Sequence, residues 1–228
     1  MAYQWILFDL DDTLFDFPAP RALELALAHY SVTLTPERLA DYQTLNQALW
    51  QQYNAGDIDA ATLKAARFRD LAPLAGVDPL TLNAQFMQQI LHCSRPLEGV
   101  VDTLRQLQGK VRMGIITNGF ADVQRARLEH SGLADCFEWM VISEELGVPK
   151  PDPRIFQCAL TQMDQVAPAD VLMVGDNPQT DVAGAAGVGM DTCWFNSQQW
   201  RFSVSAGHII DQFASLLQVP RVAALLAG

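Results

Sequence analysis

An apolar run near the start of the chain, Trp5 to Phe8, leads directly into a cluster of acids at Asp9, Asp11 and Asp12. Four consecutive apolar residues predict a strand buried on both faces, as in parallel sheets. Open α/β sheets bind ligands at the carboxyl ends of their strands, which is where these acids would lie. Acids there are costly unless a cation or a reaction uses them. Helix capping by Asp and Thr is the alternative reading of this segment taken alone.

Composition excludes several classes of protein. The chain has 228 residues, of which 50% are hydrophobic and 18% charged, and this is typical of a globular protein with a substantial core. Its formal net charge of −11 argues against a nucleic acid polymer or an anionic membrane as the partner. An anionic substrate would therefore need a metal ion or a well-placed cationic side chain at its site.

The cysteines and histidines form no metal or redox motif, because no C-x-x-C or H-x-x-x-H spacing occurs. We expect reduced thiols, which suits a cytoplasmic location, and histidines with surface or packing roles. Asp9 interrupts the first apolar stretch, so neither a signal peptide nor a membrane span is predicted. The residues concerned are Cys93, Cys136, Cys158 and Cys193, with His29, His92, His130 and His208.

Two proline-containing breaks, at residues 16–20 and 94–96, enclose a segment with helical character. Helix starts are predicted at Thr35, Asp59 and Asp78, and about four helical segments with no convincing strand are expected. We therefore predict an inserted all-helical cap over residues 17–95, which closes on the core when substrate binds, and a catalytic core formed by residues 1–16 and 96–228.

Beyond the second break, helical and strand patterns alternate, which predicts a doubly wound parallel sheet of the α/β class. Helices are expected near 97–107, 121–130 and the C-terminus, with a helix stop at Gly132. The predicted strands are 111–116, 139–142, 171–174, 192–195 and 208–210, in addition to 5–8.

Four polar segments follow strands or open helices in this α/β pattern, so the topology brings them to one edge of the sheet. Together they supply several carboxylates, hydroxyl and amide groups and one ammonium group. Carboxylates gathered around one point repel each other, and a hard divalent cation with oxygen ligands relieves that repulsion. The segments are Asp9 to Thr13, Thr117–Asn118, Lys150 to Pro153, and Gly175 to Asp181.

These four segments resemble, in order and across the whole chain, the four signature motifs of the haloacid dehalogenase superfamily. Most of its members are Mg²⁺-dependent phosphatases. The resemblance implies a Rossmann-like core, Mg²⁺ or another divalent cation such as Mn²⁺ as cofactor, and Asp9 as the nucleophile that forms an aspartyl-phosphate. It implies that Asp11 donates a proton to the leaving alcohol and then accepts one from water, as two-step hydrolysis requires.

The resemblance assigns the remaining motif residues to phosphate and metal binding. Thr117 and Asn118 would bind the phosphoryl group, and Lys150 would balance its charge and that of Asp9. The metal ligands would be Asp9, Asp176 and the main-chain carbonyl of Asp11, arranged by Asp181 and Thr13. Taken singly, each residue also has a structural reading: a solvated loop lysine, a turn, or a helix-capping acid.

The aspartate at position 11 bears on the reaction. In this superfamily, dehalogenases and the phosphonate-cleaving branch lack an acid there, whereas phosphatases and phosphomutases need it. Local motifs do not separate these last two. A catalytically silent binding module with the same fold is the alternative from another class.

Several stretches are most similar to the bacterial house-cleaning pyrimidine 5′-nucleotidases of this superfamily, including residues 115–120, 142–151 and 193–196. The resemblance implies a small-molecule phosphomonoester as the partner, namely a nucleoside monophosphate such as dUMP, dTMP or UMP. A phosphatase for phosphoglycolate or sugar phosphates is the competing interpretation. The aromatic residues Tyr42, Trp50, Tyr53 and Phe68 of the helical segment are interpreted as its own core rather than as base-stacking groups. The sequence leaves the oligomeric state open.

Overall fold

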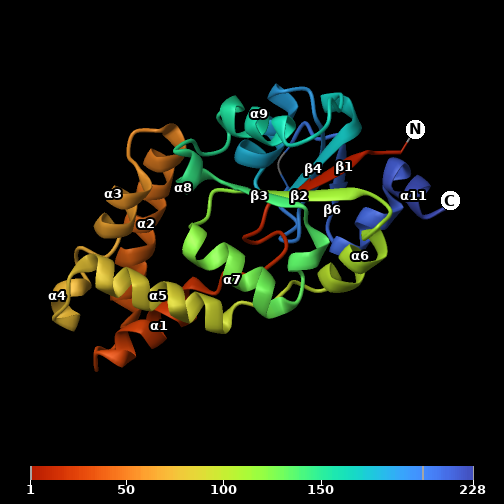
Figure 1. Cartoon of the computed structure of the whole chain (residues 1–228). Coiled ribbons are helices and arrows are strands. Elements are labelled where there is room, and N and C mark those ends of the chain that lie inside the picture. The colour runs from red at the N-terminus through yellow and green to blue at the C-terminus, as the bar shows by residue number, and fades with distance from the viewer. Residues whose placement is uncertain (1, 202, 228) are drawn as a thin grey trace. The chain divides into compact units, whose positions relative to one another are not determined.

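The computed structural model describes residues 2–201 and 203–227 and divides into two compact units, Met1–Asp16 with Arg95–Gly228, and Phe17–Ser94 (Figure 1). The first unit contains the sheet, and the second is helical. The two connections between the units pair with each other within the first unit. The Asp16 N–H donates to the Arg95 carbonyl at 3.0 Å, and the Arg95 N–H donates to the Asp16 carboxylate at 2.5 Å.

The first unit is built on a six-stranded sheet of order β3-β2-β1-β4-β5-β6, in which every neighbouring pair is parallel. This confirms the predicted α/β class and each predicted strand, with end points shifted by at most one residue. The order places β1 between β2 and β4, so the segments that follow these three strands become neighbours. The strands are β1 (Trp5–Phe8), β2 (Arg112–Thr117), β3 (Trp139–Ile142), β4 (Val171–Gly175), β5 (Asp191–Phe195) and β6 (His208–Ile210).

Helices cover both faces of this sheet, and the central strand is buried by both layers (Figure 1). Ile6 and Phe8 of β1 pack on the face covered by α6 (Val100–Leu107), α7 (Ala121–Ser131) and α11 (Pro220–Leu226). Trp5 and Leu7 pack on the opposite face, against α9 (Pro153–Thr161) and α10 (Gly184–Gly187). Alternate side chains of a strand point to opposite faces, which is why an uninterrupted apolar run was needed here.

Short helical turns complete the connections of the first unit. They are α8 (Ser143–Leu146), η1 (Ala134–Cys136), η2 (Pro168–Asp170), the π-helical turn η3 (Pro178–Ala183) and η4 (Phe213–Gln218).

One predicted helix boundary is wrong. The helix expected from residue 97 begins at Val100, because Gly99 adopts a left-handed conformation with φ of 78°. The predicted stop at Gly132 is confirmed, where φ is 67°.

The second unit consists, in its described residues, of five helices rather than about four, because the short α4 gave no separate signal. The predicted N-caps are confirmed: the side chains of Thr35, Asp59 and Asp78 each accept a hydrogen bond from a main-chain N–H of the helix they begin. The role of this unit as a cap stays a prediction. Its helices are α1 (Ala19–His29), α2 (Pro36–Ala55), α3 (Ala60–Ala66), α4 (Ala72–Ala75) and α5 (Pro79–Cys93).

An aromatic cluster forms the core of the second unit. The ring centroid of Phe68 lies 5.4 Å from that of Tyr42 and 5.5 Å from that of Phe86. All three side chains are buried. The interpretation of Tyr42 and Phe68 as core residues is therefore confirmed, and Tyr53 is buried as well, whereas Trp50 is half-buried. In neither unit is a described helix both long enough and apolar enough to cross a membrane.

Candidate active site

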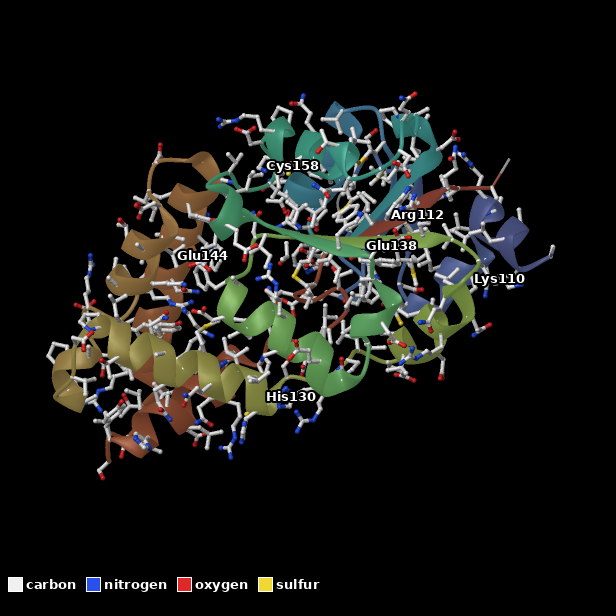
Figure 2. All side chains as sticks on the ribbon, in the orientation of Figure 1. Lys110, Arg112, His130, Glu138, Glu144 and Cys158 are labelled. Atoms are coloured by element: carbon white, nitrogen blue, oxygen red, sulfur yellow. The ribbon has the colours of Figure 1, made fainter. Side chains whose placement is uncertain are left out.

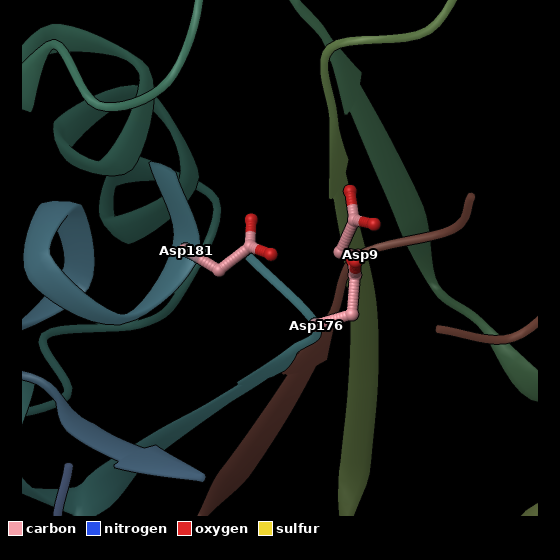
Figure 3. A group of neighbouring side chains, drawn as sticks. All are labelled: Asp9, Asp176 and Asp181. Atoms are coloured by element: carbon pink, nitrogen blue, oxygen red, sulfur yellow. The ribbon is translucent and has the colours of Figure 1, made fainter. Parts of the chain in front are cut away.

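Three acidic side chains meet at the carboxyl ends of two adjacent strands (Figure 3). Asp9 follows β1, Asp176 follows β4, and Asp181 reaches toward them from η3. Each offers one oxygen atom to a group in which these atoms all lie within 4.8 Å of one another. The predicted convergence of the first and last motifs is thus seen directly in the fold.

The ammonium group of Lys150 lies within this acidic cluster, and the residue is only 1% exposed. It donates to Asp9 at 2.5 Å, to Asp181 at 2.6 Å and to the carbonyl of Ile116 at 2.9 Å. These three bonds use all the donors of an ammonium group, so the side chain is held in one place. Burial alone would lower the pKa of Lys150, but the charges of Asp181 and Asp9 outweigh it and raise that pKa above its ordinary value.

The cluster carries more negative charge than the Lys150 ammonium balances. Burial raises the pKa of Asp9 to about 7, with Lys150 opposing the shift and Asp181 adding to it. Burial likewise raises the pKa of Asp176 to about 9, helped by the charges of Asp181 and Asp9. A hard divalent cation would offset this repulsion, and carboxylate oxygens are the ligands such ions prefer. The donor set therefore fits Mg²⁺.

Thr13 and Asp181 contact the acids as the predicted arranging residues would. The Thr13 hydroxyl accepts from the main-chain N–H of Asp176 at 3.0 Å and donates to its carboxylate at 3.2 Å. Asp181 accepts from the Asn177 N–H at 3.0 Å as well as from Lys150. Trp194, which lies in the stretch 193–196 but was not predicted as a site residue, donates to the main-chain carbonyl of Asp176 at 2.8 Å. These bonds fix the loop after β4.

Asn118 has a structural role that sequence reasoning missed. Its side-chain amide donates to the Lys150 carbonyl at 2.9 Å, and its side-chain oxygen accepts from the Lys150 N–H at 2.8 Å. The amide thus ties the segment after β2 to the loop that carries the lysine. Phosphate binding through this side chain, as predicted, would require both bonds to break.

Asp11 lies at the same edge, but its side-chain partners come from α7 rather than from the acidic cluster. Arg127 makes an ion pair with one carboxylate oxygen, and Gln124 donates to the other at 2.9 Å. Neither residue was predicted. A signal exists in the sequence, however: both share a helical face with the apolar residues Val123 and Leu128, and all four are buried. Polar residues on an apolar face indicate a partner inside the protein.

The histidines and cysteines take no part in the contacts described above. His130 lies exposed on α7, and Cys158 is half-buried on α9 (Figure 2). All four cysteines are free thiols, as predicted. His208 is half-buried, with its Nε2 atom 3.2 Å from the hydroxyl of Tyr3. Figure 2 also shows Arg112 and Glu138, an exposed ion pair with a 2.6 Å contact.

Comparisons with known proteins agree with this arrangement. The chain is 42% identical over 197 residues to pyrimidine 5′-nucleotidase YjjG of Escherichia coli K12, covering 86% of this chain and 88% of that protein. It is 32% identical to pyrimidine 5′-nucleotidase PynA of Streptococcus pneumoniae R6, covering 86% and 85% of the two chains.

A solved structure of the HAD-hydrolase YfnB of Bacillus subtilis, bound to magnesium, superposes with a TM-score of 0.84 at 29% identity, covering 96% of this chain and 99% of that one. The family model described as haloacid dehalogenase-like hydrolase matches residues 3–189. The chain therefore belongs to the haloacid dehalogenase-like hydrolase family, and it is an enzyme.

Proposed function

We propose that this hydrolase removes the phosphate group from pyrimidine nucleoside monophosphates, with Mg²⁺ as cofactor and Asp9 as the covalent nucleophile. The observation that carries the proposal is the contact between Asp9 and the buried ammonium of Lys150, within a cluster that also holds Asp176 and Asp181. Family membership and the nucleotidase relatives make the enzyme a phosphomonoester hydrolase.

The proposed reaction has two steps. In the first, an oxygen of Asp9 forms a bond to phosphorus, the bond from phosphorus to the ester oxygen breaks, and Asp11 gives its proton to the leaving nucleoside. In the second, water attacks the aspartyl-phosphate, Asp11 takes a proton from that water, and Asp9 and inorganic phosphate are released.

The other polar groups have supporting roles in this proposal. Lys150 holds Asp9 in place and adds positive charge beside the phosphoryl group, whose negative charge is dispersed in the transition state. Thr117 donates its hydroxyl hydrogen to a phosphoryl oxygen. Mg²⁺, held by Asp9, Asp176 and the Asp11 carbonyl, would further neutralise that charge.

The choice of a pyrimidine nucleotide rests on the two nucleotidase relatives. The test is a comparison of kcat/KM for UMP, dUMP, dTMP, phosphoglycolate and a set of sugar phosphates, each with and without Mg²⁺. The three nucleotides are expected to give the highest values. A preference for phosphoglycolate or a sugar phosphate would replace the nucleotidase assignment, and transfer of phosphate between two positions of a sugar would indicate a mutase. Lack of hydrolysis of every ester would overturn the proposed substrate class.

Two substitutions test the roles of the paired acids. Asp9→Asn removes the nucleophile and should abolish turnover of UMP. Asp11→Asn should lower kcat by about 10²–10⁴-fold, the range for loss of a proton-transfer residue. Acid-quench trapping of ³²P-labelled protein from labelled substrate would detect the intermediate on wild type. Turnover by Asp9→Asn at the wild-type rate would rule out the covalent mechanism.

A further inference from the structure

Two polar side chains of α7 are as deeply buried as core residues. Gln124 is 1% exposed and Arg127 is 2% exposed, and they lie one helical turn apart. Burying polar groups is costly unless every donor and acceptor finds a partner. Their hydrogen-bond partners include Asp11 and Thr117, two of the residues proposed to act on the substrate.

Gln124 joins the residue proposed to transfer protons to the residue proposed to bind phosphate. Its side-chain nitrogen donates to Asp11 at 2.9 Å and to the Thr117 hydroxyl at 3.1 Å. A carboxamide nitrogen carries two hydrogens, so both are used. Its oxygen accepts from Arg127 at 2.9 Å. Because a guanidinium group only donates, this last bond defines which end of the amide faces Asp11.

Arg127 is held in turn by groups of its own unit. It makes an ion pair with Asp11, donates to the carbonyl of Asp16 at 2.9 Å, and stacks its guanidinium 4.9 Å from the ring centre of Phe15. The two oxygens of Asp11 thus each receive a donor from α7. A carboxylate oxygen has two acceptor positions, so each oxygen retains one for substrate or water.

The same network sets the direction in which Thr117 can donate. Its hydroxyl oxygen accepts from the N–H of Gly119 at 3.0 Å and from Gln124. A hydroxyl group has two acceptor positions and one hydrogen. With both acceptor positions filled, Thr117 can meet any further partner only as a donor, which is what a phosphoryl oxygen requires.

Gly119 leaves the space that the side-chain amide of Gln124 occupies. A β-carbon at position 119 would lie 1.6 Å from the Gln124 side-chain nitrogen and 3.1 Å from a carboxylate oxygen of Asp11. Any other residue would therefore displace the amide. The glycine after Thr117 and Asn118 thus leaves the space in which the network forms.

We propose that Gln124 is a positioning residue for the reaction, supported by Arg127, that fixes Asp11 relative to Thr117. The inference rests on the proposed phosphomonoesterase function. It assigns a role in that reaction to two residues that lie outside the four predicted motifs. By bonding both residues through one rigid amide, Gln124 sets where the proton-transfer group lies relative to the bound phosphate. Catalytic groups need such placement, since displacement by about 1 Å can cost about 10²-fold in rate.

The test compares two substrates that differ in their need for a proton on the leaving oxygen. The nucleoside oxygen of UMP is a poor leaving group and needs a proton from Asp11 as it departs. The aryl oxide of p-nitrophenyl phosphate is a good leaving group and departs without a proton. For each substrate, kcat/KM reports the steps up to and including departure of its leaving group. Gln124→Leu should lower kcat/KM by about 10²-fold for UMP but by about tenfold or less for the aryl ester. The quotient of the two kcat/KM values should therefore change by at least about tenfold.

Matched variants complete the design. Arg127→Met should change the substrate ratio in the same direction, while Arg125→Met, on the same helix but in an exposed ion pair with Glu145, should change neither value. Gln124→Glu keeps the shape but presents an oxygen to Asp11 in place of a donor, so it should change the ratio even if Gln124→Leu does not fold. Thermal unfolding of each variant separates misfolding from misplacement.

The outcomes separate the inference from the proposed function. If wild type hydrolyses both esters and the Gln124 variants leave the substrate ratio unchanged, Gln124 has only a structural role and the inference is wrong. If wild type hydrolyses neither ester, the proposed function itself is wrong, and the inference falls with it.

Discussion

At the scale of single residues, loss of the Lys150 ammonium group is expected to lower both stability and activity. Replacement by Met removes three hydrogen bonds and leaves Asp9 and Asp181 buried beside each other without their shared cation. Loss of one partner of a buried ion pair costs about 3–5 kcal/mol. We expect Lys150→Met to lower the free energy of unfolding in urea by that amount and to abolish phosphate release.

The exposed Lys110 provides the control for this measurement (Figure 2). Lys110→Met should change the free energy of unfolding by no more than about 0.5 kcal/mol, as is usual for surface substitutions. If Lys150→Met is as stable and as active as Lys110→Met, the buried ammonium group contributes neither to folding stability nor to phosphate release.

Gly175, the last residue of β4, tests how closely the acids are packed. A β-carbon there would lie 2.3 Å from a carboxylate oxygen of Asp181 and 2.5 Å from the β-carbon of that residue. Gly175→Ala should displace Asp181 and lower kcat by about 10²-fold. Gly187→Ala is the control, since apart from its chain neighbours and the backbone of its own helix nothing lies within 4 Å of the added carbon. Equal activity of the two variants in steady-state assays would contradict the close packing.

At the scale of elements, the N-caps of the helical unit make its stability depend on pH. Hydrogen bonds from the Thr81 side chain and main chain lower the pKa of Asp78 below its ordinary value. A group whose pKa is lower in the folded state stabilises above its unfolded pKa, and this stabilisation is lost as pH falls through the folded value. The difference in Tm between wild type and Asp78→Ala should therefore shrink as pH is lowered from 7 to 3.

Thr35 is the neutral counterpart at the start of α2, where its hydroxyl accepts from the Arg38 N–H at 3.3 Å. Thr35→Ala should cost about 1 kcal/mol, the usual value for an N-cap, and this cost should stay the same across the pH range. A pH-independent Tm difference for Asp78→Ala would mean that its charge contributes nothing.

The bounds of strands and helices could be predicted where a continuous apolar run or an N-cap side chain marks them. Apolar runs located every strand of the sheet, and Thr35, Asp59 and Asp78 located three helix starts. The start of α6 was predicted too early, because apolar periodicity does not reveal that Gly99 has a positive φ. The left-handed backbone conformation of Gly99 therefore sets the first residue of α6, which the apolar pattern alone does not define.

At the scale of the whole molecule, the excess of acids over bases in the site should make the core dependent on divalent ions. A chelator should abolish hydrolysis of p-nitrophenyl phosphate, and added Mg²⁺ should restore it. Because an ion that binds only the folded state stabilises it, Mg²⁺ should also raise Tm with increasing concentration. Asp176→Asn should weaken this rise. Full activity after chelation, with no Mg²⁺ effect on Tm, would contradict the proposed metal site.

The sequence by itself determined the class of the fold, the order of its strands and helices, and the segments that carry the acids, since these depend on local apolar patterns and on the rule that parallel strands share an edge. It also identified Asp9, Lys150 and Asp176 as neighbours. Only the tertiary structure decided which donors hold Asp11. Gln124 and Arg127 lie 113 and 116 positions away from it along the chain, and such contacts arise from packing α7 on the sheet rather than from any local pattern.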